Sequence, residues 1–326
     1  MRLVRRGMGR VSSRVVRLTV VSVVCLPWSD ADVVVGPVPD GLDVVVYDGT
    51  GKPSRIEEIE FFVPPYMGPE PTLAVMAGMT SLRVAQTLTA GVDSVWPHLP
   101  AGVTLCNARG VHDASTAELV VGLIIASLRR IPEFVRAQDE GVWLHGRYEA
   151  LADRTVLIVG YGSVGEALER RLLPFEVDVV KVARTARGEA HGFDELADLL
   201  PQADVVVLLC PLTDTTRGLV DDTFIAAMRH GALLVNAARG PVVQTDALLA
   251  ATNAGRIRAA LDVTDPEPLP ANHPLWHAPG VLISPHVGGN TTAFLPRAYR
   301  LVRQQLERFA AGESLVNVMT PTVSND

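Results

Sequence analysis

Three residues that can bind an anion or move a proton lie in the second half of the chain, each shortly after an apolar run. Arg239, Glu267 and His286 follow the runs 232–235, 259–263 and 281–284. Ligands gather beyond the carboxyl ends of parallel strands, so we expect these three side chains to share one crevice.

The three residue types together suit the interconversion of a 2-oxo acid and a 2-hydroxy acid. The planar fork of Arg239 can bind a carboxylate and polarise the neighbouring carbonyl. His286 can donate a proton to the carbonyl oxygen as hydride arrives, and Glu267 can pair with the imidazole and orient it. This chemistry needs no metal ion, and none is predicted. Any one of these residues alone is more often a surface charge or a structural group than a catalytic residue. The prediction therefore depends on all three occurring together.

A glycine-rich segment precedes the set. Gly160, Tyr161, Gly162, Ser163, Val164 and Gly165 follow the apolar run 155–159 and lead into a helical pattern at 166–173. The glycines permit a tight turn, the approach of a pyrophosphate and close helix–strand packing, while the helix N-terminus offers free N–H groups. This context predicts a dinucleotide site and makes a simple turn the weaker interpretation.

The next apolar run, 177–182, ends where an NAD site would carry an acidic residue on the ribose. Ala183 stands there instead, followed by Arg184, Thr185 and Arg187. A guanidinium can pair with a ribose phosphate, so NADP is favoured over NAD. The alternative is that these arginines are solvated loop charges and that either cofactor is accepted.

The apolar runs predict the elements that carry these residues. In the second half, runs rich in Val, Ile and Leu at 155–159, 177–182, 203–209, 232–235, 259–263 and 281–284 indicate strands covered on both faces. In the first half, runs at 42–47, 59–63, 73–76, 84–88 and 103–106 alternate with amphipathic stretches. A helix is expected over the apolar run 119–128, with capping residues before it at 113–118, and another helix over 291–309. The tail after Val316 is expected to be frayed. The fold class is therefore α/β with parallel sheets.

Composition narrows the classes of function. The 326 residues suit two domains, and a formal net charge of −7 gives nucleic acid or an anionic membrane no general reason to bind. Cys25, Cys106 and Cys210 lack the spacing of a zinc site or a disulfide framework and are predicted to be buried thiols in a reducing compartment, the cytoplasm. The run 15–24 is predicted to be a first buried strand behind a basic leader, in preference to a secretory signal.

The segments 89–93, 160–165, 210–218, 234–241, 260–269 and 282–289 together resemble the D-isomer-specific 2-hydroxyacid dehydrogenase family, and the likeness runs from about residue 82 to 292. The resemblance implies a doubly wound NAD(P)-binding domain at 108–288, inserted into a smaller flavodoxin-like substrate domain made of 1–107 and 289–326. It also implies long crossing helices and a homodimer. Two departures are Ala183 at the place of the family's common Asp, and Glu176 at the place of a usual Gly.

The resemblance also assigns residues. Arg239, Glu267 and His286 match the family's catalytic Arg, Glu and His, and Asp262 matches the residue that holds the nicotinamide carboxamide. Ala90 and Gly91 resemble the loop whose N–H groups receive the substrate carboxylate. Further cofactor contacts are implied at Cys210, Pro211, Thr216, Ala237, Ala238 and Gly288.

The length of the chain is similar to that of short members, such as glyoxylate and hydroxypyruvate reductases. Tyr66 and Met67 are candidates for the wall of the substrate pocket, with ordinary packing as the alternative. Two other functions stay open at this point: an NAD-dependent dehydrogenase of a bulkier 2-hydroxy acid, and a dinucleotide-sensing protein like the family's corepressors.

Overall fold

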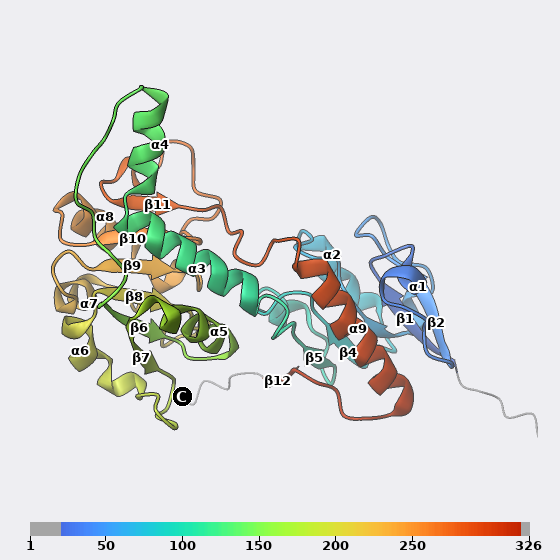
Figure 1. Ribbon diagram of the computed structural model, residues 1–326. Helices are drawn as coiled ribbons and strands as arrows, with labels where there is room; N and C mark the ends of the chain where they lie inside the picture. Colours follow the sequence, from blue (N-terminus) through green and yellow to red (C-terminus); the bar gives the residue numbers. More distant parts are fainter. Residues whose placement is uncertain (1–20, 321–326) are drawn as a thin grey trace, which may run out of the picture.

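The computed structural model describes residues 21–320 and contains two six-stranded sheets (Figure 1). The first sheet has the order β12-β5-β4-β3-β1-β2. Its strands are β1 (Ser22–Leu26), β2 (Leu42–Val46), β3 (Ile59–Phe62), β4 (Val84–Gln86), β5 (Thr104–Cys106) and β12 (Val318–Met319). All of its pairs are parallel except β12 with β5. We call the part built on this sheet the first unit.

The second sheet is parallel throughout, with the order β11-β10-β9-β8-β6-β7. Its strands are β6 (Thr155–Val159), β7 (Asp178–Val182), β8 (Val205–Leu208), β9 (Leu233–Asn236), β10 (Arg258–Leu261) and β11 (Val281–Ile283). We call the part built on it the second unit. Every residue of β8 and β9 is buried, because apolar clusters cover both faces of the sheet. The predicted α/β class is confirmed, and the antiparallel strand β12 at one edge of the first sheet is the departure from the predicted parallel sheets.

The helices connect and cover these sheets. They are α1 (Ala31–Val34), α2 (Pro71–Ala74), α3 (Asp113–Leu128), α4 (Ile131–Asp139), α5 (Ser163–Leu172), α6 (Leu196–Leu199), α7 (Asp222–Ala227), α8 (Thr245–Asn253) and α9 (Phe294–Ala311). Figure 1 shows α3 running from the first unit into the second, and the chain returning after β11 to α9, which packs on the first unit. The topology assigns strands to sheets, whereas the domain boundaries at 107/108 and 288/289 stay predictions.

Some sequence expectations need correction. The tail after Val316 was expected to be frayed, but Val318 and Met319 pair with β5; residues 321–326 lie outside the described residues. The apolar run 73–76 is helical, and the first helix of the crossing begins at Asp113 itself. The strand expected at 15–24 is found at Ser22–Leu26, while residues 15–20 and the basic leader lie outside the described residues.

The three cysteines are buried and free, as expected. Over residues 21–320, no helix has both the length and the apolar character that a membrane crossing requires.

Candidate active site

His286 and Glu267 meet beyond the ends of two neighbouring strands. Glu267 follows β10 and His286 follows β11, and His286 Nδ1 lies 2.5 Å from Glu267 Oε1. With Nδ1 engaged by the carboxylate, Nε2 is the ring nitrogen left to exchange a proton. The geometry is that of an oriented acid–base histidine.

The turn that carries His286 is built around Asp262. The buried Asp262 carboxylate accepts from Ser284 Oγ at 2.6 Å and from the N–H groups of Val287 and Gly288 at 3.0 and 2.9 Å. The N–H of His286 donates to the Asp262 carbonyl at 2.8 Å, and His286 has a φ of 53°. A left-handed conformation is costly for a non-glycine residue and persists only where neighbours hold it. Asp262 therefore shapes the turn that presents His286, and its nicotinamide contact stays a prediction.

Arg239 follows β9 and lies against the first unit. Its Nε donates to Asp93 Oδ2 at 3.0 Å, and its Nη1 donates to the Ala238 carbonyl at 2.7 Å. A Cβ atom added to Gly91 would lie 1.4 Å from Arg239 Nη2. Only glycine at 91 therefore allows this guanidinium so close to the loop. In the described part of the chain, Arg239 forms no ion pair with Glu267.

The loop around Gly91 has its carbonyls engaged and several of its N–H groups left without an acceptor among the described residues. The carbonyls of Thr89, Ala90 and Gly91 accept from Thr87 Oγ1, Asn107 Nδ2 and Thr89 Oγ1 at 2.7–2.8 Å. Within residues 21–320, the N–H groups at positions 90–92 donate to no protein acceptor. Free N–H groups beside a guanidinium form a receptor for a carboxylate.

The glycine-rich turn passes from β6 into α5 at the point where the strand order reverses. Gly160 has a φ of 104°, and a Cβ atom there would lie 2.4 Å from the backbone nitrogen of Cys210. The turn opens a cavity of about 420 Å³ at the ends of β6, β7 and β8. The cavity is lined by Gly160, Tyr161, Gly162, Ala183, Arg184, Thr185, Arg187, Phe193, Leu209, Cys210, Pro211, Thr213, Thr215 and Thr216. Its glycines and the N-terminus of α5 fit a dinucleotide.

The two arginines after β7 differ in their contacts. Arg187 Nη2 donates to the Tyr161 carbonyl at 2.6 Å and so holds the glycine-rich turn. Arg184 is exposed, and its guanidinium contacts no acceptor among the described residues. Arg184 is therefore the arginine of this cavity that is available to a phosphate.

A polar network braces the same turn. The Tyr161 hydroxyl donates to Glu169, and Lys181 pairs with Glu169 at 2.9 Å and with Glu189 at 2.8 Å. Burial, followed by the hydrogen bond to Glu169, raises the pKa of Tyr161 to about 12. Tyr161 therefore stays protonated and keeps donating at neutral pH.

The remaining residues predicted to contact the cofactor or the substrate lie partly outside the 420 Å³ cavity. Ser163, Val164, Gly165, Ala237, Ala238 and Gly288 do not line the 420 Å³ cavity. The Thr216 hydroxyl donates to the Pro211 carbonyl at 2.7 Å and shapes its own loop. Tyr66 packs on Phe294 with ring centroids 4.1 Å apart, whereas the Met67 side chain is 62% exposed.

The sequence interpretation missed five residues of the site, and one of them, Leu209, ends the apolar run 203–209 that was predicted only as a strand. Thr213, Thr215 and Asp93 lie in segments that carried the family resemblance, so a signal was present. No sequence signal pointed to Phe193, because this residue reaches the cavity from a separate 3-10 helix, Phe193–Glu195.

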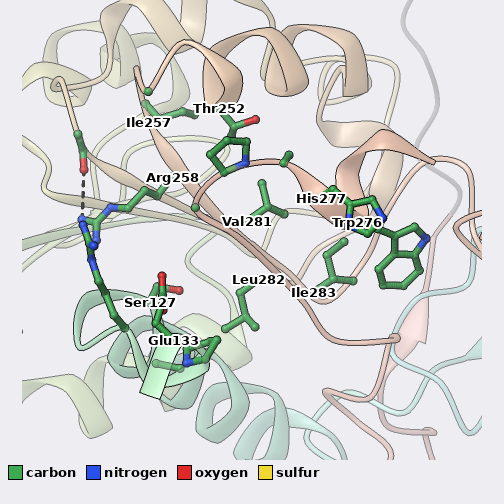
Figure 2. Close-up of a pocket in the computed structure, with 18 of the residues that line it drawn as sticks. Ser127, Glu133, Thr252, Ile257, Arg258, Trp276, His277, Val281, Leu282 and Ile283 are labelled. Carbon is green, nitrogen blue, oxygen red and sulfur yellow. Dashed lines mark hydrogen bonds between the residues drawn. The ribbon is translucent and has the colours of Figure 1, made fainter. Parts of the chain in front are cut away.

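A larger cavity, of about 810 Å³, lies on another side of the second unit (Figure 2). Figure 2 shows Ser127 and Glu133 on one side of it and Trp276, His277 and Val281 on the other. None of the predicted catalytic or cofactor-binding residues lines it. It is therefore not the candidate active site.

Comparisons with known proteins identify the family of the chain. Residues 121–288 match the model of "D-isomer specific 2-hydroxyacid dehydrogenase, NAD binding domain". Human glyoxylate reductase/hydroxypyruvate reductase is 36% identical over 235 residues, which cover 66% of this chain and 70% of that protein. Glyoxylate reductase of Thermofilum pendens is 34% identical over 74% of this chain and 77% of its own.

Among solved structures, a D-isomer specific 2-hydroxyacid dehydrogenase of Xanthobacter autotrophicus, in complex with NADPH and MES, superposes with a TM-score of 0.79. It is 31% identical, and the match covers 92% of this chain and 98% of that one. The chain thus belongs to the D-isomer specific 2-hydroxyacid dehydrogenase family, NAD(P)-dependent oxidoreductases that act on CH–OH donors.

Proposed function

We propose that this enzyme reduces a small 2-oxo acid of the glyoxylate or hydroxypyruvate type, with NADPH as the preferred reductant. The observation that carries the proposal is that His286 pairs with Glu267, while Arg239 of the same unit lies against Gly91. The N–H groups at positions 90–92 of that loop have no acceptor within residues 21–320. The His286–Glu267 pair can supply a proton, and Arg239 with the loop at 90–92 can bind a carboxylate. The names of the human and Thermofilum relatives support the substrate class.

In this mechanism, Arg239 and the N–H groups of Ala90 and Gly91 bind the substrate carboxylate. His286 donates the Nε2 proton to the carbonyl oxygen, and Glu267 holds the Nδ1–H and stabilises the imidazolium form. Bound NADPH supplies the hydride. Asp262 keeps the His286 turn in place through its three hydrogen bonds.

The preference for NADPH is supported by Ala183 and by the guanidinium of Arg184, which has no partner in the part of the chain that the structure describes. Without a carboxylate at 183, a 2′-phosphate meets no like charge at that position and can pair with Arg184. The NADPH bound to the Xanthobacter relative supports the same choice. NAD(H) remains the alternative cofactor.

The test is a panel of 2-oxo acids with NADPH and with NADH, followed by absorbance at the nicotinamide band. Glyoxylate and hydroxypyruvate with NADPH are expected to give the highest kcat/KM. His286→Ala is expected to lower kcat by about 100-fold or more, the usual contribution of a general acid.

Other outcomes would replace the proposal. Equal or better rates with NADH would remove the cofactor preference, and faster turnover of bulky 2-oxo acids would change the substrate class. Full turnover by His286→Ala would remove the mechanism. Cofactor binding without turnover of any 2-oxo acid would favour the corepressor-like alternative.

We further propose that the protein is a cytoplasmic homodimer. The free, buried thiols support a reducing compartment. An apolar strip on α4 and the segment after it supports self-association: Ile131, Val135, Val142, Trp143 and Leu144 are all exposed. Figure 1 shows α4 extending away from the sheet of the second unit.

A further inference from the structure

Asp93 bridges the two units at the candidate active site. It lies in the loop after β4, in the first unit, and accepts from Arg239 of the second unit at 3.0 Å. Among the ion pairs of residues 21–320, this is the one that joins the two units. The pair therefore forms only where the two units meet.

The contact with Asp93 determines which guanidinium nitrogen of Arg239 stays available to a substrate. Asp93 takes Nε, and the Ala238 carbonyl takes Nη1. The remaining nitrogen, Nη2, lies against Gly91, in the loop whose N–H groups at positions 90–92 donate to no acceptor within residues 21–320. Arg239 is thus held at two of its three nitrogens, with the third turned toward the carboxylate receptor.

We propose that Asp93 is a positioning residue for the substrate carboxylate: it fixes the rotation of the Arg239 guanidinium across the units and so aims Nη2 at the receptor. The inference rests on the proposed function, since it concerns the same 2-oxo acid site. Asp93 itself does not contact the substrate. The negative charge of Asp93 could instead compete with the substrate carboxylate for Arg239. The aiming role and this competing role predict opposite changes in substrate affinity when Asp93 is removed.

The competing role has a clear signature. If Asp93 merely occupied Arg239 in place of the substrate, its removal would free the guanidinium and strengthen carboxylate binding. If Asp93 aims Arg239, its removal weakens binding, and an uncharged acceptor at the same place restores part of the loss. Asparagine is such an acceptor, because its amide oxygen can still receive the Nε–H.

The experiment measures oxamate, a carboxylate probe that resembles a 2-oxo acid, by calorimetric titration of the NADPH complex. Asp93→Ala is expected to weaken oxamate binding about 10-fold or more, and Asp93→Asn about 3-fold, since losing a charged hydrogen-bond partner is costlier than neutralising it. NADPH affinity, followed by fluorescence, is expected to stay unchanged. The matched control is Asp43→Ala, which removes a carboxylate that is also paired with an arginine, Arg55, but within the first unit.

Two results would overturn the inference: oxamate binding in Asp93→Ala that equals or exceeds that of the wild type, or equal losses in Asp93→Ala and Asp93→Asn. Absence of oxamate binding to the wild type would overturn it as well, together with the carboxylate receptor. The proposed function fails separately, if the wild type binds oxamate but reduces no 2-oxo acid. If the wild type reduces glyoxylate and Asp93→Ala has the same KM for glyoxylate as the wild type, the proposed function holds and the role of Asp93 is wrong.

Discussion

Arg184 and Arg187 are close in sequence but have different tasks in the cofactor cavity. Arg187 is bound to the Tyr161 carbonyl, whereas the Arg184 guanidinium has no acceptor within residues 21–320. A charged hydrogen bond contributes about 1.5–3 kcal/mol, which is about a 10- to 150-fold change in binding. Arg184→Ala is therefore expected to raise the KM for NADPH by at least about 10-fold and to leave the KM for NADH nearly unchanged. Steady-state kinetics with each cofactor checks this.

Arg187→Ala is the matched comparison. Because Arg187 holds the glycine-rich turn that either nucleotide needs, its loss is expected to weaken NADPH and NADH alike. A selective loss of NADPH in Arg187→Ala, with no effect of Arg184→Ala, would reverse the two assignments.

At the scale of elements, the pair between Glu169 on α5 and Lys181 on β7 fixes the helix that follows the glycine-rich turn. Burial alone would raise the pKa of Glu169, but hydrogen bonds from Tyr161 and Lys181 outweigh it and leave the pKa below its usual value. A lowered pKa in the folded state adds stability above the unfolded pKa of about 4.3, and this stability is lost as pH falls through the folded value.

Glu169→Gln is therefore expected to lower the free energy of unfolding by about 1 kcal/mol at pH 7, and the difference from the wild type should shrink below about pH 4. Urea unfolding followed at several pH values checks this. Glu307→Gln, which breaks the exposed pair with Arg303, is the control and should change the free energy of unfolding by less than about 0.5 kcal/mol. A difference for Glu169→Gln that grows as pH falls would contradict the linkage.

The elements that the sequence predicts best are those whose signals are local. The glycine-rich turn lies between an apolar run and a helical pattern, so its place could be derived within about 20 residues. Glu176 shows another local cause: its φ of 59° lies where glycine is favoured, which accounts for the family's usual Gly there. The pairing of β12 with β5 joins residues about 210 apart along the chain, and no local pattern encodes it.

Contacts between the units were the least predictable part of the site. Arg239 and Asp93 are 146 residues apart, and each lies in a segment that was noticed for other reasons. Their contact depends on how the two sheets face each other, which periodicity does not encode. The same is true of Phe193, whose place in the cavity depends on the path of the chain after β7.

At the scale of the whole molecule, the crossing segments are fixed by a buried histidine. His112, at the start of α3, lies 2.8 Å from the Leu88 carbonyl through Nε2 and 3.2 Å from the Gly289 carbonyl through Nδ1. Ser115 and Thr291 add a hydrogen bond of 2.8 Å between the same segments. These contacts join both crossings near the site, and none of them involves α4, whose outer side is exposed at Ile131 and Val135.

That outer side bears the apolar strip on which the dimer proposal rests. The Trp143 side chain is 92% exposed, and a large apolar group left in water forgoes a favourable burial of about 2–3 kcal/mol. A second copy that covers the strip recovers this energy on both chains, because a two-fold interface uses the same patch twice. The double variant Val135→Asp, Trp143→Ser is therefore expected to shift a dimer to a monomer in light scattering coupled to size exclusion. Val33→Asp, at an 81% exposed apolar position on α1, is the control and should leave the mass unchanged. A wild type that runs as a monomer, or a double variant that stays dimeric, would remove the strip from the interface.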